Sequence, residues 1–153
     1  MRPAIILPVT SWAERTSRSL REHGYRTGGA REAVIELLGT ERCCSTAQEL
    51  HDRLHQRGRR VGLASVYRAL ELLTELGLAK RIDVGEATAR YEAAHVEEHH
   101  HHVVCDDCGR IESFEDAPLE RAIAAVEERL GYAVAMHEVV LRGACDDCRR
   151  ATA

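Results

Sequence analysis

The sequence has no apolar run that approaches the roughly 18 residues needed to cross a membrane as a helix. The apolar stretch Ile5-Ile6-Leu7-Pro8-Val9 is too short, and too poorly flanked, for a secretory signal. Neither a His-Glu-x-x-His motif nor a Ser/His/Asp pattern of a hydrolase is present. These absences favour a cytoplasmic protein that is neither membrane-bound nor an enzyme.

Six cysteines are present, and four of them form two Cys-x-x-Cys pairs, Cys105/Cys108 and Cys145/Cys148. In a cytoplasmic chain, cysteines at such spacing favour metal binding over disulfides. A two-residue spacer lets both thiolates of a pair reach one ion at ~2.3 Å, and two pairs complete a tetrahedral shell. Redox dithiols are the alternative, but no thioredoxin-like βαβ pattern surrounds the pairs. The sequence therefore predicts a structural Zn²⁺ site.

Four consecutive histidines, residues 99–102, run into the first cysteine pair on an apolar, strand-like stretch. Neighbouring side chains of a strand point to opposite faces, so His99 and His101 share one face and His100 and His102 share the other. One strand can therefore serve two metal sites, each of which needs ligands from elsewhere. One predicted site combines His100 and His102 with candidates in or next to the first half of the chain: Cys44, Glu92 and His95. The other combines His99 and His101 with Glu120 and His137.

The candidate ligands outside the histidine run also have simpler interpretations. Each acid alone is also typical of a solvated surface carboxylate, and His137 is also compatible with a core histidine. Cys43, next to Cys44, is interpreted as a small buried residue.

The net charge of −4 conceals two halves of opposite sign. Residues 1–81 contain 14 Lys and Arg against 9 Asp and Glu, whereas residues 82–153 contain 7 against 16. A basic half suits a polyanion such as DNA, and an acidic half attracts cations. The asymmetry favours two domains with different partners, although two ordinary solvated surfaces would give the same counts.

Helical spacing of apolar residues predicts four helices in the first half, which end at Gly24, Gly39, Gly58 and Gly77. The first and third begin with capping-box patterns, Ser11 with Glu14 and Ser45 with Gln48. The spacing then becomes alternating over residues 79–84 and 88–92, which predicts a β-hairpin. Helices followed by a hairpin describe a winged helix-turn-helix, whose fourth helix, with Ser65 and Arg68 on its polar side, would enter the DNA major groove.

The second half is predicted to form strands over residues 99–104, 110–114 and 133–141 and a helix over residues 118–130. Because one helix on three strands gives a thin core, zinc and dimer contacts are the expected supports. The fold class is therefore α+β. Residues 1–92 form a winged-helix DNA-binding domain with a loose end at 1–10, residues 93–98 a hinge, and residues 99–153 a small α/β dimerisation and metal-binding domain.

Several motifs together resemble the ferric uptake regulator (Fur) family of metal-dependent bacterial repressors. They are Gly62-Leu63-Ala64-Ser65-Val66-Tyr67-Arg68-Ala69-Leu70, Arg90-Tyr91-Glu92, the run from His99 to Gly109, and Cys145-x-x-Cys148. The resemblance covers about residues 20–149. It implies a homodimer whose metal-filled form closes onto a palindromic double-stranded operator.

The resemblance also implies residue roles. Tyr67 and Arg68 would meet bases in the major groove, and Arg26 matches a basic position that reaches the minor groove. Glu92, His100 and His102 match the regulatory metal site, and His99, His101, Glu120 and His137 match a second site.

Some positions depart from the family pattern. Gly28-Gly29 replaces the usual Thr-Pro start of the second helix, Cys44 stands where a regulatory histidine is common, and Ser113 stands at an acidic position. A thiolate at Cys44 favours Zn²⁺ slightly over Fe²⁺ as the regulatory metal, whereas Glu92 with two histidines also suits Fe²⁺. A nickel- or peroxide-responsive member of the family, a metal-buffering protein and a zinc enzyme are the alternatives.

Overall fold

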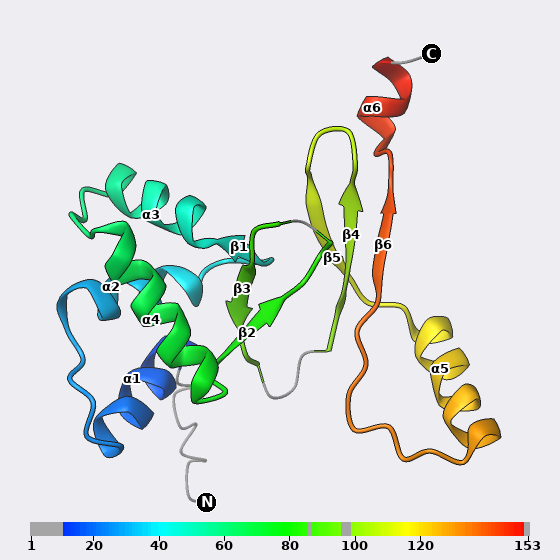
Figure 1. Cartoon of the computed structure of the whole chain (residues 1–153), viewed down its shortest axis with the longest axis horizontal. Helices are drawn as coiled ribbons and strands as arrows, with labels where there is room; N and C mark the ends of the chain where they lie inside the picture. The colour runs from blue at the N-terminus through cyan, green and yellow to red at the C-terminus, as the bar shows by residue number, and fades with distance from the viewer. Residues whose placement is uncertain (1–10, 86, 96–98, 152–153) are drawn as a thin grey trace, which may run out of the picture. The chain divides into compact units, whose positions relative to one another are not determined.

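A computed structural model describes residues 11–85, 87–95 and 99–151, and the chain divides into two compact units, residues 1–95 and 96–153. The predicted loose end at 1–10 and residues 96–98 of the predicted hinge lie outside the described residues. Among the described residues, every helix is too short or too polar to span a bilayer. Figure 1 shows the helices and strands of both units.

Over its described residues, the first unit contains four helices and a small antiparallel sheet. The helices are α1 (Trp12–Glu22), α2 (Gly29–Leu38), α3 (Ala47–Gln56) and α4 (Leu63–Glu75). The strands are β1 (Ser45–Thr46), β2 (Ala79–Ile82) and β3 (Arg90–Ala93), in the order β1-β3-β2. The predicted winged helix-turn-helix is confirmed in its order of elements, because α3 and α4 are followed directly by the β2–β3 hairpin.

Periodic apolar residues explain why these helices pack together. The fully buried core includes Leu20, Val34, Leu38, Leu50, Leu54, Val66, Leu70 and Leu73, which lie on the inward faces of α1 to α4. These positions recur every three or four residues, so each helix contributes one apolar stripe. The opposite side of α4 is left exposed.

The start of α3 differs from the sequence prediction. Thr46, and not Ser45, caps the helix: its Oγ1 accepts the backbone N–H of Glu49, and the Glu49 carboxylate accepts the N–H of Thr46. Ser45 instead pairs with Tyr91 in the sheet, and its hydroxyl accepts a hydrogen bond from Arg53 at 2.9 Å. The two-residue strand β1, which the sequence did not reveal, therefore shifts the cap by one residue. The predicted Ser11–Glu14 capping box of α1 is confirmed.

Residues 99–151, the described part of the second unit, form a three-stranded sheet with two helices. Its elements are β4 (His101–Cys105), β5 (Ile111–Phe114), α5 (Ala117–Leu130), β6 (Val140–Gly143) and α6 (Asp146–Ala151). The central strand β4 is antiparallel to β5 and parallel to β6. The predicted last strand over residues 133–141 is wrong in its bounds, because pairing with β4 begins only at Val140.

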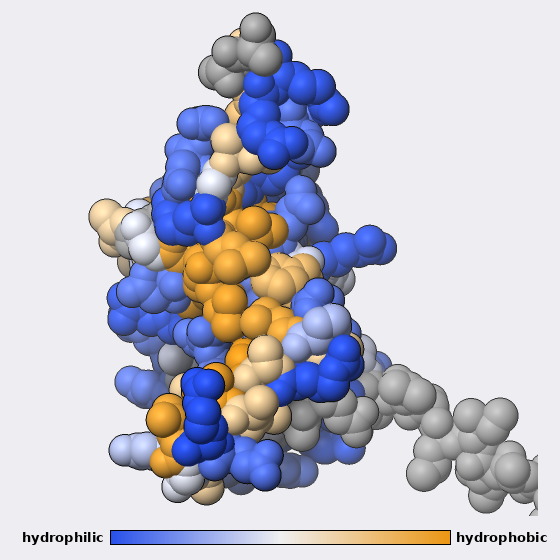
Figure 2. Space-filling model, turned by 90° about the vertical axis from the view of Figure 1, so that its right-hand side faces the viewer, coloured by the Kyte–Doolittle hydropathy of each residue, from blue (hydrophilic) through white to orange (hydrophobic). Residues whose placement is uncertain are grey.

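Helix α5 buries no residue within the described chain. Its apolar positions Val126 and Leu130 are 41% and 61% exposed, and Met136 in the following segment is 78% exposed. Figure 2 shows apolar side chains gathered in a band on the side of the molecule that carries α5 and β6. A single copy of the chain therefore leaves an apolar face of its second unit uncovered, and such faces mark association sites.

Candidate metal centres and candidate DNA-binding face

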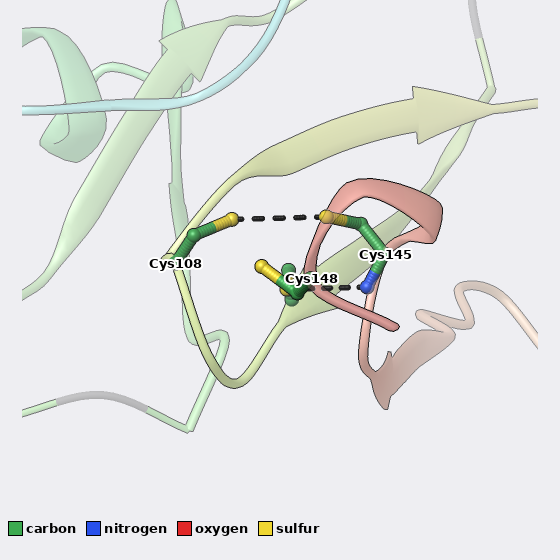
Figure 3. A group of neighbouring side chains, drawn as sticks. Cys108, Cys145 and Cys148 are labelled. Carbon is green, nitrogen blue, oxygen red and sulfur yellow. Dashed lines mark hydrogen bonds between the residues drawn. The ribbon is translucent and has the colours of Figure 1, made fainter. Parts of the chain in front are cut away.

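The two Cys-x-x-Cys pairs meet at one end of the second sheet. Cys105 ends β4, Cys108 lies in the turn that follows, and Cys145 and Cys148 flank the start of α6. Because β4 and β6 run parallel, with Cys105 paired to Gly143, both pairs emerge at the same end. All four sulfurs lie within 4.8 Å of one another, and Sγ of Cys108 and Sγ of Cys145 are 3.9 Å apart (Figure 3).

This sulfur spacing suits a shared ion. A disulfide requires a sulfur separation of ~2.05 Å, whereas two thiolates bound at ~2.3 Å to one tetrahedral ion lie about 3.8 Å apart. The cysteines described in the structure are all outside disulfides. The four-cysteine cluster is therefore consistent with the structural zinc site that the spacing predicted.

Backbone hydrogen bonds stabilise the thiolate form of one sulfur in the cluster. Sγ of Cys105 accepts the backbone N–H of Cys145 at 3.2 Å, and this bond, with that from the N–H of Cys108, lowers the pKa of Cys105 to about 6. The thiols of Cys145 and Cys108 raise the pKa of Cys148 above its usual range. Without an ion, one sulfur is therefore mostly a thiolate at neutral pH while another keeps its proton.

Two ion pairs hold the cysteine loops together. Arg110, just before β5, binds Asp147 of α6 at 2.9 Å, and Nε of Arg142 in β6 binds Asp106 in the first loop at 2.9 Å. Each pair joins one loop to the other half of the cluster, so the loops reinforce each other's position.

A second cluster lies on one face of β4. His101 in β4, His99 just before it, Glu120 in the first turn of α5 and His137 before β6 bring their ligand atoms within 4.8 Å of one another. Nε2 of His101 is 2.6 Å from Oε1 of Glu120, and Nε2 of His137 is 3.2 Å from Oε2. Nε2 of His99 and Nε2 of His137 are only 2.9 Å apart.

This arrangement fits a transition metal. Three imidazole Nε2 atoms and a carboxylate converge on one point, which is a ligand set that Zn²⁺, Fe²⁺ and related ions accept. The ring of His101 is fully buried, and its Nδ1 is a buried atom with no hydrogen-bond partner among the described residues. The hydrogen bond with His101 lowers the pKa of Glu120, so this ligand is ionised at neutral pH.

The residues of the predicted regulatory site belong to different units. His100 and His102 in the second unit have ring centroids 5.1 Å apart, on the face of β4 opposite His101. In the first unit, Cys44 directly precedes β1, and the antiparallel register Ser45↔Tyr91 continued by one residue places it opposite Glu92. His95 has its ring centroid 6.4 Å from that of Trp12 and lies in none of the ligand groups found among the described residues. A site that combines the two sets stays a prediction.

The prediction that Cys43 is a small buried residue is wrong, because Cys43 is only half-buried and its Sγ donates to Sγ of Cys44 at 4.0 Å. Cys44 itself is 5% exposed. The Cys43 thiol and burial both raise the pKa of Cys44 well above its usual range, and the Glu92 carboxylate adds to this effect. The adjacency of two cysteines in the sequence was the signal that could have identified the pair.

The exposed side of α4 carries the predicted DNA-binding residues. Tyr67 is 38% exposed, and the Arg68 guanidinium donates to the Ser65 hydroxyl at 2.9 Å. A surface pocket of about 270 Å³ lies between this side of α4 and the start of α2, with three arginines in its lining: Arg26, Arg31 and Arg68. Arg26, Ser65 and Arg68 thus line one basic pocket, which suits phosphate groups.

Comparisons with known proteins point to one family. The model of the "Ferric uptake regulator family" matches residues 22–142. The ferric uptake regulation protein of Bacillus subtilis is 32% identical over 141 residues, which cover 88% of this chain and 93% of that protein. The zinc uptake regulation protein of Mycobacterium tuberculosis is 38% identical over 128 residues, with 82% and 96% covered.

The fold comparison agrees. The structure of the Helicobacter pylori ferric uptake regulator, described as having three functional metal-binding sites, matches with a TM-score of 0.79 and 26% identity. The match covers 91% of this chain and 92% of that one. Relatives named for iron and for zinc are thus both similar to this chain.

Proposed function

The chain belongs to the ferric uptake regulator family, and from this premise we propose that it is a metal-responsive DNA-binding repressor of metal-uptake and metal-homeostasis genes. It acts in the cytoplasm as a homodimer on a palindromic operator. Zn²⁺ is slightly favoured as the regulatory metal, with Fe²⁺ next, and the four-cysteine cluster holds a structural Zn²⁺.

One observation carries this proposal: a winged-helix unit with an exposed basic face and a unit rich in metal ligands occur in the same chain. A metal buffer would need the second unit but not the pocket lined by Arg26 and Arg68. An enzyme would need an open metal position beside a general base. The four-cysteine cluster offers four ligands and so suits a closed structural site instead.

The way in which metal binding would regulate DNA binding follows from the positions of the ligands in the chain. Cys44 and Glu92 belong to the first unit, and His100 and His102 belong to the second. Ligation of one ion by both sets would fix the orientation of the DNA-binding unit. In a homodimer, DNA-binding units held in this orientation would place the two α4 helices at the spacing of successive major grooves. That spacing is about one helical turn of DNA.

The exposed apolar face of the second unit supports the dimer. Val126, Leu130 and Met136 lie on it, and an identical face on a second copy would cover it in a two-fold arrangement. Dimerisation also explains how a helix with no buried residue remains stable, because α5 would gain its packing partner from the other copy.

Selection of DNA from a random pool tests the function. The full chain, loaded with zinc, is used to retain duplexes over several rounds, and the retained pool is sequenced. The proposal predicts enrichment of an inverted repeat whose retention disappears when the regulatory metal is removed by a mild chelator. Enrichment of no sequence, with zinc present throughout, would instead support a metal buffer.

A further inference from the structure

The connection between α2 and β1 carries two consecutive cysteines whose sulfurs lie 4.0 Å apart. Cys43 is half-buried and Cys44 is buried, so the Cys44 sulfur is largely shielded from solvent. Neither sulfur is part of a disulfide. The family's four-ligand pattern, as the resemblance implies it, uses only the position of Cys44.

The covalent geometry of neighbouring residues disfavours a disulfide here. Consecutive Cα atoms are ~3.8 Å apart across a trans peptide bond, whereas disulfides span Cα separations of about 4.4–6.8 Å. An ion imposes no such requirement, because two thiolates on one tetrahedral ion lie about 3.8 Å apart. The observed 4.0 Å therefore needs only a small adjustment, and it is close to the 3.9 Å between Cys108 and Cys145 in the four-cysteine cluster.

Charged groups around the pair are consistent with a cation. Glu92 lies on β3 opposite Cys44 when the β1–β3 register is continued by one residue. Its carboxylate raises the pKa of the Cys44 thiol by charge repulsion. Arg90, the other charged residue acting on Cys44, pairs with Glu49 at 3.1 Å, so part of its charge is already neutralised. The first unit thus offers two sulfurs just before the edge strand β1 and one carboxylate on the neighbouring central strand β3.

We propose that Cys43 and Cys44 together form a dithiolate half-site for a thiophilic divalent cation of the Zn²⁺ and Cd²⁺ class. On binding, both S–H bonds lose their protons to solvent and two S–metal bonds form, with no change of oxidation state. A second sulfur makes the site softer, so it discriminates against Fe²⁺ and Mn²⁺. The regulatory consequence of this selectivity rests on the proposed function, but ion binding by the two thiols does not.

Cobalt binding to the full chain tests the half-site. The chain is first loaded with one equivalent of Zn²⁺, which fills the four-cysteine cluster, and Co²⁺ is then added. Sulfur-to-cobalt charge-transfer absorption reports only thiolate ligands, so Co²⁺ at the histidine cluster does not contribute to it. Mass spectrometry after alkylation shows in parallel which cysteines the metal protects.

Wild type is expected to show the charge-transfer band and protection of both Cys43 and Cys44. Cys43→Ser and Cys43→Ala are expected to lose about half of the band and to weaken Zn²⁺ binding about tenfold or more, because loss of a ligand costs at least as much as loss of a supporting contact. Arg42→Lys, at the neighbouring exposed position, is the matched control and should keep the wild-type band.

An unchanged band in both Cys43 variants, or alkylation of Cys43 that metal does not slow, would overturn the half-site. Metal-dependent DNA binding by wild type would then still stand, and only the role of Cys43 would be lost. Conversely, a band that depends on Cys43 in a chain that selects no DNA would uphold the half-site and contradict the proposed function.

Discussion

Glu120 and His101 join a helix to a strand, with Oε1 of the carboxylate 2.6 Å from Nε2 of the imidazole. Helix α5 buries none of its residues in the described chain, and Glu120 also lies 3.2 Å from Nε2 of His137 and 3.5 Å from Nε2 of His99. Metal ligation at this cluster would therefore also position the apolar face of α5 for its partner.

We expect Glu120→Gln to weaken metal binding at the histidine cluster about tenfold or more, because the amide supplies no negative charge. Competition with a chromogenic chelator measures the affinity of the histidine cluster for metal, in a chain whose four-cysteine cluster is already filled. Glu128→Gln, an exposed change on the same helix, is the control and should leave the affinity unchanged. Equal affinities for Glu120→Gln and wild type would remove Glu120 from the site.

We expect Cys145→Ser to lose one zinc per chain and to unfold the sheet end of the second unit. The variant deletes one of the four sulfurs of the cluster, and structural zinc contributes on the order of 10 kcal/mol to folding. Zinc analysis and hydrogen exchange of β4 and β6 measure the two effects. Asp107→Asn, in the loop between Cys105 and Cys108, keeps all four sulfurs and should retain the zinc. A fully zinc-loaded Cys145→Ser variant would contradict the assignment.

Acidification through about pH 6 should weaken zinc binding at the four-cysteine cluster, because protons then compete with zinc for the Cys105 sulfur. In the metal-free chain the N–H groups of Cys145 and Cys108 lower the pKa of Cys105 to about 6, from about 8.5 in an unfolded thiol. A lowered pKa means that the thiolate's stabilising contribution is complete above the unfolded value and is lost as pH falls through 6. A zinc affinity of the cluster that does not fall between pH 7 and pH 5 would contradict this expectation.

We expect Arg68→Ala to weaken binding to a selected duplex by about 1–3 kcal/mol, because the guanidinium lies on the exposed side of α4 beside Ser65. Arg68→Lys should recover only part of the loss, since lysine lacks the planar fork that reads guanine. Anisotropy titrations at one salt concentration measure both. Arg18→Ala, an exposed change on α1, controls for net charge. If it weakens binding as much as Arg68→Ala, the specific role of Arg68 is excluded.

We expect Thr46→Ala to destabilise the first unit by about 1 kcal/mol, because it removes the N-cap of α3. Gln48→Ala changes an exposed position and should cost no more than about 0.5 kcal/mol. Denaturant unfolding followed by circular dichroism of the helices compares the two variants. The reverse order of costs would favour the Ser45–Gln48 capping box that the sequence suggested.

Much of the fold was predictable because it depends on local periodicity. The stripes of Val34 and Leu38 in α2 and of Val66 and Leu70 in α4 repeat at helical spacing, and these residues are buried. Strand alternation likewise placed His99 and His101 on one face and His100 and His102 on the other. In the structure the ring centroids are 4.8 Å apart in the first pair and 5.1 Å apart in the second. The four-cysteine cluster followed from ligand spacing alone.

Features that depend on tertiary pairing were not predictable in this way. Strand β1 is only two residues long, so no alternation marks it, and its pairing with β3 moved the α3 cap from Ser45 to Thr46. The last strand begins at Val140, where its register with β4 starts, although alternation in the sequence starts earlier. Helix α6 has no apolar stripe, and its start coincides with the second cysteine pair.

The most direct test of the proposed mechanism is the affinity of the full chain for its selected duplex as a function of added metal, at fixed salt and with the four-cysteine cluster already filled. Metal ligation across the two units predicts that affinity rises by between about 5- and 150-fold as one further ion binds per chain. The same affinity before and after that ion binds would contradict the account.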